Sequence, residues 1–284
     1  MSVDIDHLKT WIGKTESTTD VVTPVPVAAL SATLDRDDDS PKNGDALPPL
    51  WHWLYFLPVV KQSELGPDGH PKRGGFLPPV ELPRRMWAGG RLTFHQPLRI
   101  GDTIARVSTV AGVTHKAGRS GDLVFVLAKH EISNAAGLAI SEEHDIVYRD
   151  PPRPGDPAPK PQAAPAEQAW LREVQPDDVF LFRYSALIFN AHRIHYDRRY
   201  VTGKEGYPGL IVHGPLIATL LLDLLRRKMQ KASVASFSFR AIKPLFDLAP
   251  FYVCGMLERD GKTVHLWAKD ADGWLTMDAT AKLS

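Results

Sequence analysis

Residues 214–229 read GPLIATLLLDLLRRKM, a run in which apolar side chains point to nearly every side of a helix. Pro215 stands at a first helical position, and three basic residues come near the end, where they suit the negative end of a helix. A helix that is apolar all round has to be enclosed by other elements. This stretch therefore predicts a central, buried helix.

Segments with alternating polar and apolar residues follow this helix, and Asp-Gly pairs separate them as tight turns do. They comprise residues 235–242, 251–258, 263–270 and 274–283. The first part of the chain has a similar order of segments. An apolar stretch at 25–38 and an aromatic-rich one at 48–58 precede alternating runs at 91–98, 102–115, 122–133 and 138–150.

This repetition predicts an α+β protein made of two copies of one unit, each an antiparallel sheet wrapped around a central helix. A stretch with seven prolines between Pro151 and Pro165 separates the copies and cannot form the interior of an element. We therefore predict a first domain at 1–149, a proline-rich linker at 150–169 and a second domain at 170–284.

The composition of the 284 residues limits the classes of function. The net charge of +1 disfavours nucleic acid and acidic membranes as partners, and the single cysteine, Cys254, rules out an internal disulfide. The N-terminus has no apolar signal core, and the apolar stretch at 209–225 is too interrupted to span a bilayer. We expect a cytoplasmic protein that binds neither membranes nor nucleic acid.

Polar residues cluster at 189–197, FNAHRIHYD, next to strongly apolar segments. A metal site would use His192 and His195, with Asp197 or His213 as a third ligand. That interpretation is weak, because the glutamate of the common HExxH arrangement is missing. Another interpretation is that the histidines satisfy hydrogen bonds at a buried turn.

The sequence HGPL at 213–216 favours a third interpretation, an acid–base site. The first N–H groups of a helix lack internal partners and carry partial positive charge, so they can bind a carbonyl oxygen that gains negative charge. Gly214 would let such a carbonyl approach the backbone closely. A neutral histidine can take a proton from water, and the amide of Asn190 could hold that water.

At these residues the chain resembles the MaoC-type (R-specific) enoyl-thioester hydratase and dehydratase family, which has the hotdog fold. The motif Asn190-x-His192-x-x-His195-x-Asp197 and the later Gly209-x-x-x-His213-Gly214 carry the resemblance. The longer phrases RYSALIFNAHRIHYD and RRMWAGGRLTFHQPLRIGDTI resemble one branch of the family. That branch contains mesaconyl-CoA and itaconyl-CoA hydratases and mitochondrial hydroxyacyl-thioester dehydratases.

The resemblance implies a double hotdog whose second half carries the chemistry, while the first half helps to form the acyl tunnel. It implies that His195 is catalytic and that the N–H of Gly214 polarises the thioester carbonyl. Asn190 departs from the family, because most members carry a catalytic aspartate there. With a neutral amide at this position, His195 would act as the general base and Asn190 would orient the water.

The resemblance also suggests residues that bind the substrate. His192 and His213 lie within the matching motifs, and a free carboxylate on the acyl group would require a cation such as Arg193 or Arg240. Further candidates are three arginines for the phosphates of coenzyme A and five aromatic residues for the tunnel wall. They are Arg84, Arg85 and Arg91, and Trp51, Trp53, Tyr55, Phe56 and Trp87.

The leading hypothesis is therefore reversible hydration of a short enoyl-CoA, with dicarboxylic acyl groups such as mesaconyl and itaconyl included. The alternatives are a 3-hydroxyacyl-carrier-protein dehydratase and a non-catalytic protein that binds acyl thioesters. The partner would be the acyl-CoA substrate, with no metal and no cofactor beyond the coenzyme A that the substrate contains. Exposed sheet edges are compatible with a homodimer.

Overall fold

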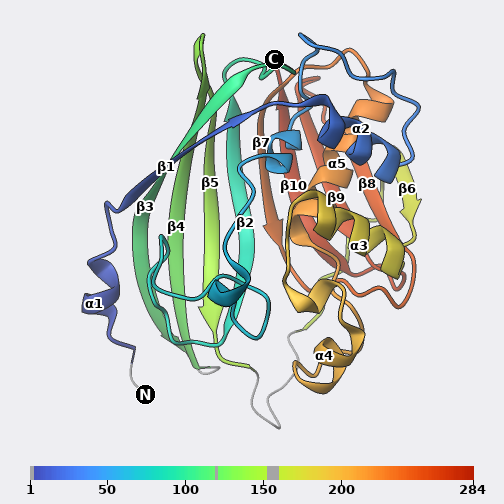
Figure 1. Cartoon of the computed structure of the whole chain (residues 1–284). Coiled ribbons are helices and arrows are strands. Elements are labelled where there is room, and N and C mark those ends of the chain that lie inside the picture. The colour runs from blue at the N-terminus through green and yellow to red at the C-terminus, as the bar shows by residue number, and fades with distance from the viewer. Residues whose placement is uncertain (1–2, 119–120, 152–159) are drawn as a thin grey trace.

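The computed structural model describes residues 3–118, 121–151 and 160–284. The described strands form one antiparallel sheet in the order β1-β3-β4-β5-β2-β7-β10-β9-β8-β6 (Figure 1). Strands from the first half of the chain thus occupy one side of the sheet, and strands from the second half occupy the other. The strands are β1 Thr15–Val21, β2 Arg84–Phe94, β3 Thr103–Gly118, β4 Gly121–Asn134, β5 Gly137–Arg149, β6 Trp170–Val174, β7 Val234–Ala241, β8 Phe251–Leu257, β9 Thr263–Lys269 and β10 Leu275–Leu283.

The described helices are short, with one exception, α5. The α-helices are α1 Ile5–Lys9, α2 Pro24–Thr33, α3 Asp178–Leu187, α4 Arg198–Gly203 and α5 Gly214–Lys228, and the 3-10 helices are η1 Trp51–Leu54, η2 Gln62–Glu64 and η3 Arg193–His195. Among the described residues, no helix is both long and apolar enough to span a membrane.

Helix α5 is the predicted central helix of the second half. Every residue from Leu216 to Leu225 is buried, and the helix packs on β8 with further contacts to β6, β9 and β10. Pro215 lies in its first turn and the basic residues 226–228 in its last, as predicted. The buried leucines of α5 belong to the largest hydrophobic cluster of the molecule, which also includes residues of the first half.

The first half differs from this pattern, because no long central helix is found among its described residues. The aromatic segment predicted to match the central helix forms only the short 3-10 helix η1. Prolines at 48, 49 and 58 flank this segment, and Leu50 and Phe56 on either side of η1 have left-handed φ angles of 70° and 55°. Prolines on both sides leave too few residues for several helical turns.

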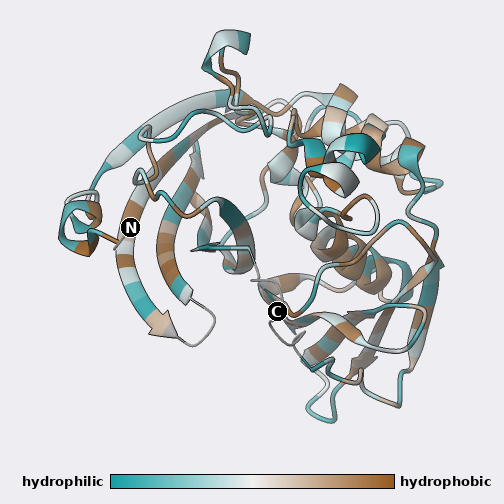
Figure 2. Cartoon of the chain, turned by 90° about the horizontal axis from the view of Figure 1, so that it is seen from below, coloured by the Kyte–Doolittle hydropathy of each residue, from teal (hydrophilic) through white to brown (hydrophobic). Residues whose placement is uncertain are grey.

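The two halves of the sheet meet where β2 pairs with β7, and this junction requires two glycines. Gly89 lies opposite Arg240, and Gly90 lies opposite Phe239. A Cβ at Gly89 would lie 2.6 Å from the backbone oxygen of Phe239, and one at Gly90 would lie 2.9 Å from its ring. The sheet also has a register shift between Trp87 and Gly89. In Figure 2, seen from below, the strands of the first half curve as an arch.

The predicted strands agree with the observed ones within a few residues, apart from three differences. Strand β2 begins at Arg84 rather than at residue 91, because Gly89 and Gly90 interrupt the alternation in its first part. The edge strands β1 and β6 lack a clear apolar alternation and were not predicted. Within the predicted linker, residues 152–159 lie outside the described part, and Ala163 forms a bridge with Trp274.

Candidate active site

The polar motif forms a tight turn between α3 and the 3-10 helix η3. Phe189 has a left-handed φ of 49°, and the N–H of Asn190 donates to the carbonyl of Ser185 at 2.8 Å. The side-chain oxygen of Asn190 accepts from the N–H of His192 at 2.9 Å. Because this oxygen holds the turn, the amide N–H groups of Asn190 are the ones left to face a ligand.

His195 is buried and held in one orientation. Its Nδ1 donates to the backbone carbonyl of Ile211 at 2.7 Å, which leaves Nε2 of the neutral ring as a proton acceptor. Burial lowers the pKa of His195 to about 4, against the opposing effect of the Ile211 carbonyl. The imidazole is therefore neutral, and competent as a base, throughout the physiological pH range.

His213 lies behind His195 and is not among the residues that line the cavity, although it was predicted as a possible substrate contact. Its ring stacks on that of His195 with 3.7 Å between centroids and 17° between planes. Its Nε2 is 2.8 Å from the hydroxyl of Ser185 on α3. His213 is fully buried, and burial holds its pKa well below the ordinary value.

Helix α5 begins at a cavity that lies next to the motif, and Gly214 lines this cavity. A Cβ built at Gly214 would have no atom within 4 Å, so the protein itself leaves room for a side chain here. The first main-chain bond of the helix runs from the N–H of Ile217 to the carbonyl of His213, which leaves the earlier N–H groups without helical partners. The open space lies where a carbonyl oxygen could reach the positive end of the helix.

A loop from the first half of the chain lies against the motif and completes the site. The N–H of Arg193 donates to the carbonyl of Asp68 at 2.9 Å. Gly69 has a φ of +89°, and a Cβ there would lie 1.8 Å from the backbone oxygen of Ala191. Asp68 Oδ2 is 2.9 Å from Nδ1 of His70, whose ring lies 3.9 Å from that of His192.

The charges of this loop are coupled to the motif. Burial would raise the pKa of Asp68, but the hydrogen bond and the charge of His70 outweigh burial and hold that pKa below its ordinary range. Burial lowers the pKa of His70 and brings that of His192 to about 2. Asp68 and His70 both line the pocket, and the sequence interpretation missed them because GPDGHP has the composition of an ordinary turn.

The suggested metal ligands do not come together as a set. Nδ1 of His195 is engaged by Ile211, and the carboxylate of Asp197 caps α4 and pairs with Arg193. Within the described chain, the group with ligand atoms close enough for a metal ion is instead Asp68, His70 and His192, whose atoms lie within 4.8 Å of one another. Asp68 and His70 already bond to each other, an arrangement typical of an oriented histidine.

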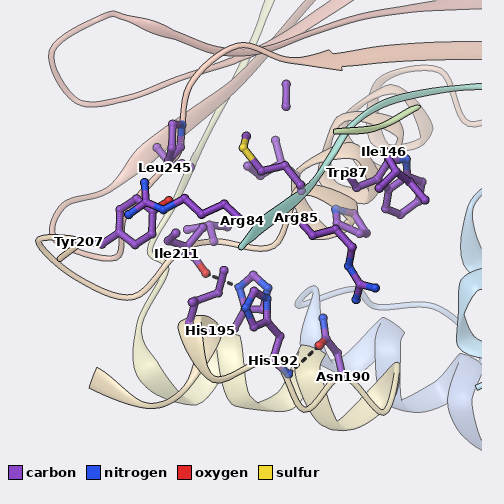
Figure 3. Close-up of a pocket in the computed structure, with 18 of the residues that line it drawn as sticks. Arg84, Arg85, Trp87, Ile146, Asn190, His192, His195, Tyr207, Ile211 and Leu245 are labelled. Carbon is purple, nitrogen blue, oxygen red and sulfur yellow. Dashed lines mark hydrogen bonds between the residues drawn. The ribbon is translucent and has the colours of Figure 1, made fainter. Parts of the chain in front are cut away.

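These residues surround a cavity of about 430 Å³ that both halves line (Figure 3). One wall is polar and contains Asn190, His192 and His195. The other wall is largely apolar and includes Leu77, Trp87, Ile146, Ile217, Leu245 and Met277. A cavity with an apolar wall and a few convergent polar groups is typical of a site for a small organic substrate.

Several predicted binding residues lie elsewhere. The guanidinium of Arg193 pairs with Asp197 at 2.7 Å, stacks on Tyr200 and donates to the carbonyl of Pro67, so it clamps the loop of the first half. Arg240 is exposed on β7 and does not line the cavity. Arg91 is paired with Glu143 and Asp145 outside it.

Of the arginines and aromatic residues predicted to meet coenzyme A or form the tunnel wall, three line this cavity, namely Arg84, Arg85 and Trp87. Trp51 lines a second cavity of about 440 Å³ instead. The side chains of Tyr55 and Phe56 are buried in the large hydrophobic cluster, against which Trp53 packs. These four aromatic residues serve the core rather than the wall of the site.

A profile of the hydroxyacyl-thioester dehydratase type 2 family matches residues 50–247. The chain belongs to this family. One relative of the chain is the mesaconyl-C(4)-CoA hydratase of Chloroflexus aurantiacus. The two are 49% identical over 96% of this chain and 96% of the relative. The region that the family profile matches contains the loop at Asp68 and the motif through Gly214, and so it covers the polar residues of the site.

Two solved structures show the same fold as this family member. A MaoC-like dehydratase from Phytophthora capsici covers 99% of each chain at a TM-score of 0.69 and 13% identity. A Mycobacterium tuberculosis protein described as having a double hotdog fold covers 96% of each chain at a TM-score of 0.59 and 13% identity. The predicted double hotdog is confirmed, and the family is one of hydro-lyases.

Proposed function

We propose that the protein catalyses the reversible hydration of an α,β-unsaturated acyl-CoA thioester, with His195 as the general base. The observation that supports this most directly is the state of His195. The imidazole is buried and neutral, and its Nδ1 is fixed on the carbonyl of Ile211, so Nε2 is a proton acceptor of defined position. Such a group can remove a proton from water as the water attacks carbon.

In the hydration direction, the water oxygen bonds to the β-carbon and its proton passes to Nε2 of His195. The π electrons of the double bond move toward the thioester oxygen, which gains negative charge next to the N–H of Gly214 and the positive end of α5. The proton then returns from His195 to the α-carbon, and the thioester carbonyl re-forms. Dehydration follows the same steps in reverse, and the enzyme is regenerated in both directions.

Asn190 is proposed to orient the attacking water. Its oxygen is occupied by the N–H of His192, so its amide N–H groups can donate to the water oxygen but cannot remove a proton. His192 is proposed to contact the substrate, because it lines the cavity between His70 and His195. The reaction needs no cofactor beyond the coenzyme A of the substrate.

The acyl group is proposed to be short and to carry a free carboxylate. This is supported by the relative that is named mesaconyl-C(4)-CoA hydratase and is 49% identical to this chain. When such a group is joined through C4, the β-carbon bears both a methyl group and the carboxylate. The domain limits, a homodimer and a cytoplasmic location stay predictions.

One assay separates this function from its alternatives. Loss of enoyl-thioester absorbance is followed with crotonyl-CoA, mesaconyl-C4-CoA and a crotonyl-carrier protein. Itaconyl-CoA, whose double bond is not conjugated with a C4 thioester, is followed by chromatography of its product. The proposal expects hydration of CoA thioesters, with mesaconyl-C4-CoA preferred. Activity on the carrier protein alone would identify a carrier-protein dehydratase. Binding of every thioester without turnover would identify a non-catalytic binding protein.

A further inference from the structure

Arg85 is a cation at the catalytic end of the cavity. It is the second residue of β2 and lies opposite Tyr148 on β5. Its side chain lines the cavity together with Asn190 and His192. In Figure 3 its side chain leaves the strand and points toward the loop that carries Asn190. The side chain is only half-buried, so it can reach a ligand in the cavity.

Arg85 hydrogen-bonds the hydroxyl of Tyr148, but within the described part of the chain it has no carboxylate partner. The other cations that line the cavity are engaged by a backbone carbonyl, an aromatic ring or a carboxylate. Arg84 donates to the carbonyl of Glu205 and lies over the ring of Tyr207 at 4.7 Å. Lys243 also lines the cavity, but its ammonium group pairs at 2.6 Å with Asp270, which does not.

The acids of the cavity are also engaged by other groups. Asp68 is bonded to His70 at 2.9 Å, and the carboxylate of Glu205 accepts from the hydroxyl of Tyr200 at 3.0 Å. Neither forms an ion pair with Arg85. A guanidinium that faces a largely apolar cavity without a carboxylate partner is a ready site for an anionic group.

The charge of Arg85 acts on the residues around the catalytic centre. Burial is the main cause of the lowered pKa values of His70 and His192, and the positive charge of Arg85 lowers both further. Burial raises the pKa of Tyr148, and Arg85 opposes that rise. These effects agree with the geometry, in which Arg85 lines the same cavity as His70 and His192 and lies opposite Tyr148.

We propose that Arg85 binds the free carboxylate of the acyl group and thereby selects dicarboxylic substrates. This inference rests on the proposed function. With the thioester carbonyl at Gly214, the phosphates of coenzyme A lie away from the histidines by the length of the pantetheine arm, which does not suit a cation in this position. A carboxylate on the β-carbon lies next to the attacking water, and Asn190 is the residue toward which Arg85 points. The planar guanidinium can hold that carboxylate through two parallel hydrogen bonds.

The test compares a charged and a neutral substrate in Arg85→Met and Arg85→Lys. For each variant, kcat/KM is measured with mesaconyl-C4-CoA, and crotonyl-CoA is measured both as a substrate and as a competitive inhibitor. Arg91→Met is the matched control, because Arg91 lies on the same strand and pairs with acids outside the cavity. Thermal unfolding verifies that every variant is folded.

We expect Arg85→Met to lower kcat/KM for mesaconyl-C4-CoA roughly 100-fold and to leave the rate and inhibition constant of crotonyl-CoA within about threefold. Arg85→Lys keeps the charge but cannot form the two parallel hydrogen bonds of a guanidinium, so we expect kcat/KM for mesaconyl-C4-CoA to fall roughly tenfold. The control should match the wild type on both compounds.

Equal losses on both compounds would overturn the proposal, because they would assign Arg85 to coenzyme A or to the fold. Wild-type rates with mesaconyl-C4-CoA in folded Arg85→Met would overturn it as well. A wild-type protein that hydrates no thioester would instead refute the proposed function, so the two failures are distinguishable.

Discussion

Among the single residues, His195 has the most completely defined environment. Ile211 fixes one ring nitrogen, His213 supports one ring face, and the remaining nitrogen is available to a ligand. A base in this setting keeps its lone pair only while its pKa stays below the working pH. Burial achieves this, because it disfavours the charged imidazolium form.

This environment predicts an unusual pH profile. Because the pKa of His195 is lowered to about 4, its neutral form persists well below the ordinary histidine pKa of about 6.5. We expect kcat/KM for crotonyl-CoA to stay level from pH 7 to about pH 5 and to fall tenfold per pH unit below about pH 4. The uncharged acyl group of crotonyl-CoA avoids titration of a substrate carboxylate. A folded enzyme whose activity halves near pH 6.5 would contradict the assignment.

The sequence predicted the residues of the motif that line the cavity better than it predicted their surroundings. Asn190, His192, His195 and Gly214 all line one cavity, because the motif and the helix start carry strong local signals. Arg193 and Arg240, by contrast, do not line this cavity, since charge and position in a motif do not show which way a side chain points.

Two short elements complete the site, a loop from the first half and the first turn of α5. Asp68 and His70 on that loop were not predicted, because contacts across more than 100 residues leave no local pattern. The central helix of the first half was predicted and is replaced by η1, since apolar composition alone did not reveal the effect of the flanking prolines. Local periodicity predicts elements well and contacts between them poorly.

An added methyl group at two glycines in these elements should have different effects on stability. Gly69→Ala forces a methyl against the backbone of Ala191 at a positive φ, so the loop has to move, at a cost of at least about 1–2 kcal/mol of stability. Gly214→Ala meets no protein atom, so its stability should stay within about 0.5 kcal/mol of the wild type.

Activity should fall in both glycine variants. In Gly69→Ala the loop that carries Asp68 and His70 is displaced from the cavity. In Gly214→Ala the methyl group occupies the space proposed for the thioester carbonyl, and we expect kcat/KM to fall by about 10–100-fold. Denaturant unfolding and initial rates measured on the same samples check this pair. A Gly214→Ala enzyme with wild-type rates would show that the carbonyl binds elsewhere.

In the whole molecule, a buried cluster of charges joins the two halves. Asp223 on α5 has a side chain that is 1% exposed, and it pairs with Arg36 from the first half at 2.5 Å. Arg172 and Arg227 also pair with it, each at 2.7 Å. The cluster thus ties α5 of the second half to the segment at Arg36 of the first half.

Removal of the shared carboxylate should weaken the entire fold. Asp223→Ala leaves three partly buried arginines without their common partner, and we expect a loss of about 3 kcal/mol in the free energy of unfolding. Asp6→Ala, which removes an exposed pair with Lys9, is the control and should change stability by less than about 0.5 kcal/mol. Urea denaturation checks both variants, and equal midpoints would refute the structural importance of the cluster.

The most direct test of the proposed chemistry is the rate of enoyl-CoA hydration by His195→Ala, measured beside the wild type and with thermal unfolding as a check on folding. General-base catalysis by one side chain contributes about 10²–10⁴-fold to a rate, so kcat should fall by about 10³-fold while the protein stays folded. A folded His195→Ala protein that hydrates mesaconyl-C4-CoA within tenfold of the wild-type rate would contradict the assignment of His195 as the base.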